Sequence, residues 1–177
     1  MSMSREQTKK ILQARAKVLA HEGKDETARG ESVRVVEFNL SNERYAIESI
    51  YIREVLPLKE LTVVPCTPPY ILGIINLRGQ ILSIIDLRVF FDLPREAATS
   101  ATKIIVLSLN EMELGIVVDE VTGARSITLD HLHVGPPTLT GIREVYLRGV
   151  AEEDLVFLDA AKLLTDKLIV VDEEVEV

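Results

Sequence analysis

The feature that most constrains the fold of this chain is an internal repeat. The pattern Phe38-Asn39-Leu40, Tyr45-Ala46-Ile47 and Ile52 recurs as Leu107-Ser108-Leu109, Leu114-Gly115-Ile116 and Val121. A later pair of blocks also matches: Tyr70-Ile71-Leu72-Gly73 leads to Ile84-Ile85-Asp86-Leu87, and Tyr146-Leu147-Arg148-Gly149 leads to Val156-Phe157-Leu158-Asp159. Repetition over this length predicts two structurally equivalent halves.

Each half is predicted to consist of short strands. Val36, Phe38 and Leu40 alternate with polar residues, which is typical of a half-buried strand. Because about five short strands per half are too few to bury both faces of an open sheet, closure into two small barrels that share a core is favoured. Asp86 and Asp159 each precede a short, largely apolar run and are predicted to cap short helices.

The ends of the chain differ from this central part. Ser4 and Gln7 have the spacing of a capping box and predict an amphipathic helix over residues 4–22. The predicted organisation is an N-terminal helix and linker (1–32), a core domain (33–167) and an acidic C-terminal tail (168–177). Within the core domain, lobe one is expected at about 33–92 and lobe two at about 100–166, with a short helix near the C-terminus.

Composition argues against several classes of protein. The net charge of −8 lacks the positive excess that binding to phosphates requires, so nucleic acid is not an expected partner. The single cysteine, Cys66, cannot form an intramolecular disulfide, which fits a reducing cytoplasm. No apolar run approaches the roughly 18 residues that span a bilayer, and no signal peptide is evident. We expect a cytoplasmic protein without direct membrane insertion.

Candidate catalytic and metal-binding residues are few. Cys66 has no histidine partner in a recognisable motif, and the sequence has neither a glycine-rich phosphate loop nor a nucleophile elbow. His131 and His133 would share one face of a strand, as a metal site requires, but further ligands at a suitable spacing are not apparent. We therefore expect no enzyme, metal or cofactor. The alternative is a barrel that binds a metal ion or small ligand, or that is catalytic, and that uses Asp119, His131 and His133.

A central segment, residues 68–88, carries a resemblance to a known family. It contains Gly73, then Asn76-Leu77-Arg78-Gly79, then an apolar strand that ends in Asp86-Leu87-Arg88. This order resembles the signature of the CheW family, the coupling proteins of bacterial chemosensory arrays. The resemblance covers roughly residues 33–166 and includes Ile52-Arg53-Glu54-Val55 and Gly115-Ile116-Val117-Val118-Asp119.

The resemblance implies a fold and a function. The implied fold is all-β, with two intertwined SH3-like five-stranded β-barrel lobes. The implied function is that of a non-enzymatic adaptor, which joins the cytoplasmic tip of chemoreceptors (methyl-accepting chemotaxis proteins) to the regulatory domain of the CheA histidine kinase. Such an adaptor would lie at the inner face of the membrane, within receptor arrays. The same coupler in a non-flagellar motility or regulatory pathway remains an alternative.

The resemblance also implies an interface. It places Glu54 and Arg78 near one another on the binding surface. Arg78 at a turn is able to offer its planar guanidinium to a carboxylate, either as a surface bridge to Glu54 alone or also as a charge positioned for a partner. The side chains of Ile52 and Val55 either pack in the core or contact a partner, and the sequence leaves both alternatives open. The predicted interface residues are Ile52, Glu54, Val55, Gly73, Asn76, Arg78 and Gly79.

Overall fold

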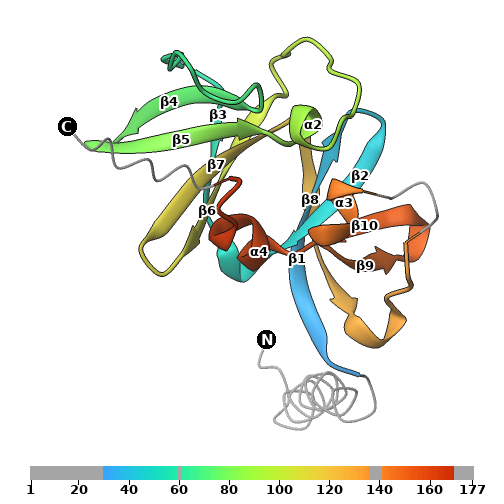
Figure 1. Cartoon of the computed structure of the whole chain (residues 1–177). Coiled ribbons are helices and arrows are strands. Elements are labelled where there is room, and N and C mark those ends of the chain that lie inside the picture. Colours follow the sequence, from blue (N-terminus) through green and yellow to red (C-terminus); the bar gives the residue numbers. More distant parts are fainter. Residues whose placement is uncertain (1–29, 60, 136–140, 170–177) are drawn as a thin grey trace, which may run out of the picture.

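The computed structural model describes residues 30–59, 61–135 and 141–169. The predicted helix over residues 4–22 and most of the predicted acidic tail lie outside these ranges. The described residues form two five-stranded mixed sheets, with short helical segments between some of the strands (Figure 1). The predicted all-β class is therefore confirmed.

The two sheets, named A and B, have the following elements. In spatial order, sheet A contains β8 (Glu120–Thr128), β1 (Ser32–Leu40), β2 (Glu43–Glu48), β10 (Leu155–Leu158) and β9 (Leu147–Ala151). Sheet B contains β3 (Ile52–Pro57), β6 (Lys103–Leu109), β7 (Met112–Val118), β5 (Gln80–Asp86) and β4 (Ile71–Leu77). The helical segments are η2 (Ser49–Tyr51), α2 (Leu87–Phe90), η3 (Leu129–His131), α3 (Ile142–Val145), η4 (Glu152–Asp154) and α4 (Ala160–Thr165).

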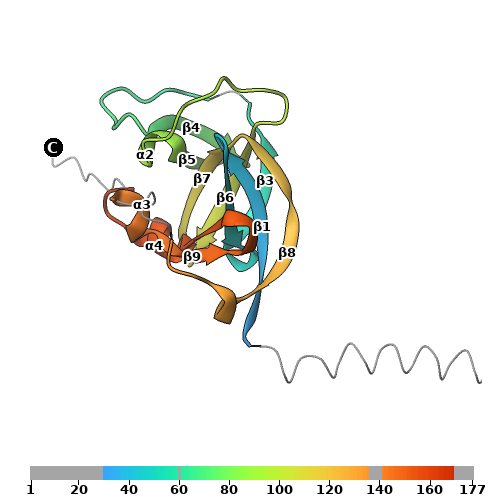
Figure 2. The same cartoon turned by 90° about the vertical axis from the view of Figure 1, so that its right-hand side faces the viewer.

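Each sheet combines strands from both halves of the repeat. Sheet A joins β1 and β2 of the first half to β8, β9 and β10 of the second, and sheet B joins β6 and β7 to β3, β4 and β5 (Figures 1 and 2). Four pairings make this exchange: β2 with β10 and β5 with β7 are parallel, and β1 with β8 and β3 with β6 are antiparallel. The expected lobe bounds of about 33–92 and 100–166 therefore do not match the sheets, whereas the intertwining does match the fold that the resemblance implied.

The repeat relates the two sheets element by element. Strands β1 to β5 correspond to β6 to β10, and the spatial order of sheet A maps onto that of sheet B. Two isolated bridges are also equivalent: Thr62 pairs with Ile74 in sheet B, and His133 pairs with Val150 in sheet A. Each bridge adds a loop segment to an edge strand, which helps the short sheet to curl into a barrel-like lobe.

The largest hydrophobic cluster lies between the sheets and is named the shared core. It takes Phe38 and Tyr45 from sheet A and Ile105 and Leu107 from sheet B, all fully buried. The rings of Phe38 and Tyr45 are stacked with their centroids 6.2 Å apart. Two smaller hydrophobic clusters each pack within one sheet, one in sheet A and one in sheet B. Because burial of one such side chain contributes about 1.5–3 kcal/mol, the shared core is the main force that holds the two sheets together.

The two short helices begin where the sequence predicts. Asp86 accepts a hydrogen bond from the Arg88 N–H at 3.0 Å, at the start of α2. Asp159 accepts one from the Lys162 N–H at 3.0 Å, at the start of α4. Both carboxylates satisfy a backbone donor that has no partner within its own helix, so the prediction of two N-caps is confirmed.

Candidate interaction site

The β4–β5 hairpin presents Arg78 to solvent. Leu77 pairs with Gln80, so Arg78 and Gly79 form the two-residue turn, with φ of 52° and 86°. Positive φ at both positions is typical of a type I′ turn, which fits the twist of a hairpin. Asn76 Oδ1 accepts a hydrogen bond from the Gly79 N–H at 2.8 Å. Asn76 and Gly79 therefore shape the turn, and the Arg78 side chain is 68% exposed.

Arg78 forms a bidentate ion pair with Glu54. Its Nη1 and Nη2 donate to Glu54 Oε1 and Oε2 at 3.0 and 2.9 Å. Glu54 lies in β3 and Arg78 follows β4, and these are the two edge strands of sheet B. The pair thus joins the two edges where the sheet curls upon itself. The structure brings together the two residues that the resemblance placed side by side.

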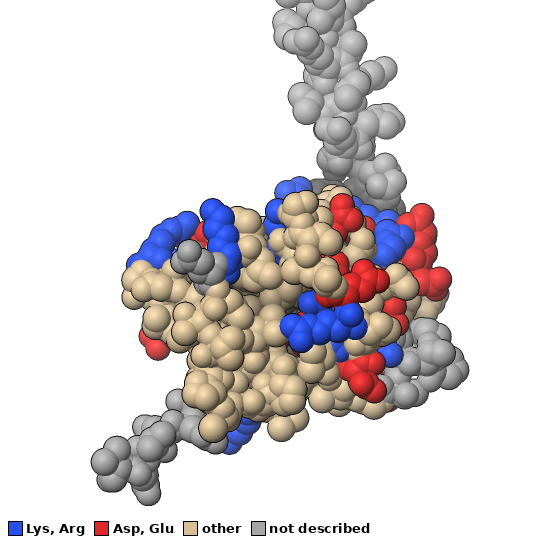
Figure 3. Space-filling view, turned by 90° about the horizontal axis from the view of Figure 1, so that it is seen from above, with Lys and Arg blue, Asp and Glu red and all other residues tan. Residues whose placement is uncertain are grey.

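An open apolar groove lies beside this ion pair, between β3 and β4. Its volume is about 850 Å³. The residues that line it are Leu56, Pro57, Lys59, Thr62, Ile75, Asn76, Leu77 and Ile104. Figure 3 views the molecule from above and shows a broad area of surface without charged side chains, with Lys and Arg side chains at its border. An apolar segment of a partner protein fits such a groove.

The equivalent position in sheet A has different chemistry. A smaller cleft of about 120 Å³ is lined there by Arg125, Ser126, Ile127, Thr128, His131, Ala151 and Glu152. By the repeat, Arg125 stands where sheet B has Leu56, and Ala151 stands where it has Ile75. The two corresponding ends of the molecule are therefore unlike, one apolar and one charged.

The other predicted interface residues differ in how far they are buried. Gly73 is buried, and a Cβ at this position would lie 2.2 Å from the Thr62 carbonyl oxygen, so close backbone approach accounts for the glycine. Ile52 is half-buried and packs on the shared core, whereas Val55 is 41% exposed. Of these three residues, Val55 alone offers an exposed apolar side chain. The predicted interface residues therefore differ in their exposure.

Comparisons with known proteins assign the family. A family model described as the CheW-like domain matches residues 34–168. The chain belongs to the CheW-like domain family. Chemotaxis protein CheW of Klebsiella aerogenes is 35% identical over 133 residues, which are 73% of this chain and 80% of the relative. Chemotaxis protein CheW of Treponema pallidum is 29% identical over 144 residues, which are 77% of this chain and 85% of the relative.

A solved structure supports the same assignment. The scaffolding protein TtCheW from Thermoanaerobacter tengcongensis matches with a TM-score of 0.68 and 28% identity, over 80% of this chain and 95% of that one. The predicted CheW family is thereby confirmed. Membership in a family of scaffolding proteins agrees with the expectation of a non-enzymatic adaptor.

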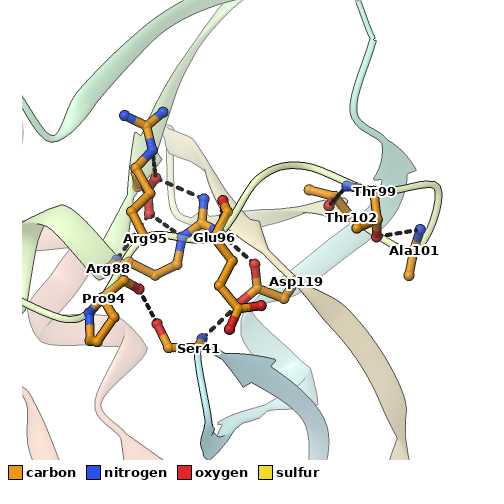
Figure 4. A network of polar contacts seen from close by, with 10 residues as sticks. Ser41, Arg88, Pro94, Arg95, Glu96, Thr99, Ala101, Thr102 and Asp119 are labelled. Atoms are coloured by element: carbon orange, nitrogen blue, oxygen red, sulfur yellow. Dashed lines mark hydrogen bonds and ion pairs between the residues drawn. The ribbon is translucent and has the colours of Figure 1, made fainter.

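One buried ion network of this CheW-like chain was not predicted from the sequence. Arg88 is almost fully buried, and its Nε and Nη2 donate to Asp86 Oδ1 and Oδ2, both at 2.8 Å. Its Nη1 donates to Asp119 (Figure 4). Hydrogen bonding to Asp86 raises the pKa of the Arg88 guanidinium against the opposing effect of burial, so the group stays charged. The signal in the sequence was the Asp86-Leu87-Arg88 spacing.

The residues of the alternative metal-binding hypothesis do not come together as a metal site. His131 ends η3, the His133 backbone pairs with Val150, and Asp119 accepts hydrogen bonds from Ser41 and Arg88. Within residues 30–59, 61–135 and 141–169, no group of three or more His, Cys, Asp or Glu side chains could hold a metal ion. In the same ranges, no helix has the length and hydropathy needed to cross a membrane.

Proposed function

We propose that this chain is a non-enzymatic adaptor that binds a chemoreceptor tip and the regulatory domain of a CheA-type histidine kinase at the same time. Membership in the CheW-like domain family carries the proposal. The unlike ends of the molecule support it, because an adaptor needs two different surfaces. In this proposal the protein lies at the inner face of the membrane through its contact with receptors.

Simultaneous binding gives the adaptor its mechanical role. Each contact alone needs only modest affinity, because engagement of one partner raises the effective concentration of the other. A receptor that holds the adaptor differently in two signalling states then shifts the conformational equilibrium of the attached kinase. No chemical step on the adaptor is required.

The Arg78–Glu54 pair and the adjacent groove form the proposed docking surface of sheet B. A guanidinium has five N–H donors, and Glu54 takes only two of them, so Arg78 retains donors for a carboxylate of the partner. The groove beside it accommodates apolar side chains of the same partner. Val55 lies in the same edge strand, β3, but on the face opposite to Glu54 and Leu56, so its exposed side chain is not part of this surface.

Exchanging the charges of Arg78 and Glu54 tests whether a partner recognises this ion pair or whether the pair only stabilises the fold. We expect Arg78→Glu and Glu54→Arg each to weaken binding of the receptor tip or the kinase regulatory domain by about tenfold or more, the scale of a truncated hot spot. The double variant restores the ion pair but leaves its charges reversed, so we expect binding to stay weak. Affinity is measured by pull-down and by titration of each purified partner.

The control is Glu48→Ala, which removes the 2.9 Å ion pair between Arg148 and Glu48 on sheet A. It should leave binding to the sheet B surface unchanged. Recovery of full affinity in the double variant would show that the pair acts through folding alone. Unchanged affinity in both single variants, with folding verified by circular dichroism, would remove these residues from the interface.

A further inference from the structure

The buried ion network around Arg88 lies where the chain passes from one sheet to the other. Asp119 is the single residue between β7 of sheet B and β8 of sheet A. Its N–H donates to the Asn39 carbonyl oxygen in β1 at 3.0 Å. The backbone at this crossing is therefore fixed to sheet A.

The carboxylate of Asp119 is bonded to both sheets. Its Oδ2 accepts a hydrogen bond from the Ser41 N–H at 2.6 Å, and Ser41 lies in the β1–β2 turn of sheet A. Its Oδ1 accepts from Nη1 of Arg88, in the α2 helix that follows β5 of sheet B (Figure 4). One side chain thus ties the two sheets together directly.

The connection between α2 and β6 closes over this network. The Arg95 Nε lies 3.4 Å from Asp86 Oδ2, and the Ser41 hydroxyl donates to the Pro94 carbonyl oxygen. Three segments that are remote in sequence meet there: the β1–β2 turn, residues 86–96 and the crossing at Asp119. Asp86 and Arg88 are both buried. Movement of one segment would therefore leave a buried charge without its partner, which costs folding free energy.

The repeat shows that the fold itself does not require this network. Asp86 corresponds to Asp159, which caps α4, but Arg88 corresponds to Ala161. The other crossing between the sheets, η2, consists of Ser49, Ile50 and Tyr51 and carries no charged side chain. A buried ion pair contributes little net stability compared with apolar residues of the same volume. A gain in net stability therefore does not account for the network.

We infer that the network of Ser41, Arg88 and Asp119 fixes the orientation of sheet A relative to sheet B, and thereby the spacing between the two partner-binding surfaces. The second part of this statement rests on the proposed function. Arg88 and Asp119 are then positioning residues: they contact no partner, and they set the geometry in which both partners are held.

The test measures the distance between the sheets. Spin labels are placed at Arg34→Cys in β1 and Ser83→Cys in β5, two exposed strand positions, with the native cysteine removed by Cys66→Ser. Pulsed electron paramagnetic resonance then gives the distance distribution in the folded protein. We expect Asp119→Ala to shift or broaden this distribution. A distribution identical to that of the wild type would overturn the inference.

Glu113→Ala is the matched control. Glu113 accepts from Arg53 Nη1 at 2.6 Å, but both residues belong to sheet B, and the Glu113 side chain is exposed to a similar extent, 25% against 19% for Asp119. It should leave the distribution unchanged, and an equal shift in this variant would also contradict the inference. Should Asp119→Ala fail to fold, Asp119→Asn keeps the side-chain volume, removes the charge and is subject to the same comparison.

A second measurement addresses the link to partners. We expect Asp119→Ala to bind each isolated partner as the wild type does but to lose kinase activation when both are present. Full activation together with a shifted distance distribution would overturn the second part of the inference. Failure of the wild type to bind either partner would instead contradict the proposed function, and the distance result would stand by itself.

Discussion

Gly73 belongs to the segment that resembles the family signature, and the local structure explains why this position holds a glycine. Its φ is 147°, and a Cβ there would lie 2.2 Å from the Thr62 carbonyl oxygen. Thr62 and Ile74 exchange backbone hydrogen bonds of 2.9 and 2.8 Å, so this carbonyl cannot move without loss of the bridge. Gly73 thus maintains the edge of sheet B beside the proposed docking groove.

We expect Gly73→Ala to lower the free energy of unfolding by about 1–3 kcal/mol, because strain at this φ adds to the steric clash. The control is Gly123→Ala in β8, where an added Cβ meets no atom within 4 Å. Urea unfolding measures both variants. Equal stability of Gly73→Ala and the wild type would contradict the close approach described above.

Asp166 gives a second prediction at the scale of one residue. Its carboxylate accepts hydrogen bonds from the Leu168 N–H at 2.8 Å and from the Tyr146 hydroxyl at 2.7 Å. These bonds, the first being the larger cause, lower the pKa of Asp166 below its ordinary value of 3.8. The stabilisation is therefore present above that value and is lost as pH falls through the lower pKa of the folded state.

We expect Asp166→Asn to be less stable than the wild type at neutral pH, and the difference to shrink below about pH 4 as the wild-type carboxylate becomes protonated. Denaturant unfolding at a series of pH values measures this difference. A difference that stays constant down to acid pH would show that the charge of Asp166 is not the stabilising factor.

At the scale of elements, the two short helices allow the stability contribution of an N-cap to be compared with that of an N-cap that also holds a buried ion pair. Asp159 caps α4 and forms no ion pair in the described part of the chain, whereas Asp86 caps α2 and also holds Arg88. We expect Asp159→Ala to cost about 0.5–2 kcal/mol. Asp86→Ala should cost about 3–5 kcal/mol, because it leaves the buried guanidinium without its bidentate partner.

Urea unfolding compares the two variants with the wild type under identical conditions. Equal losses in the two variants would contradict the structural role of the Asp86–Arg88 pair. The comparison is well matched because the repeat places both aspartates at the start of equivalent helices.

The strands and caps were predictable from the sequence because their signals are local. Alternation in β1 and an aspartate before each short helix sufficed. The exchange of strands was not predictable from the residues, because the parallel pairings β2–β10 and β5–β7 join distant segments. The run from Tyr45 to Leu56 looks strand-like throughout, yet η2 interrupts it where the chain crosses between sheets.

In the candidate site, too, local features were predictable from the sequence and contacts between distant segments were not. The turn at Arg78 follows from local sequence, but the pairing of Arg78 with Glu54 came only from the family resemblance. The contact between Arg88 and Asp119 joins residues 31 positions apart, and nothing in the pattern of either segment indicates it. Gly73 was predicted as an interface position, which stays a prediction, and its surroundings give a packing reason for the glycine.

At the scale of the whole molecule, the shared core makes the two sheets one cooperative unit. It includes fully buried side chains from both sheets, so neither sheet keeps its apolar face covered without the other. We expect a single unfolding transition in urea, with coincident midpoints by far-ultraviolet and tyrosine near-ultraviolet circular dichroism. Two separate transitions would contradict a shared core.

The unlike ends of this unit support the adaptor proposal, which family membership carries. The apolar groove beside Arg78 belongs to sheet B, and the charged cleft near Arg125 occupies the equivalent position in sheet A. A duplicated fold with two different surfaces is suited to hold two different proteins at a fixed spacing. The central claim is therefore simultaneous binding.

The most direct measurement of that claim is co-sedimentation of a receptor cytoplasmic fragment and a CheA-type kinase, with and without this chain. We expect the kinase to sediment with the receptor fragment only when the chain is added, and all three proteins to be recovered together. If the chain binds neither protein, or if one displaces the other from it, the account is contradicted.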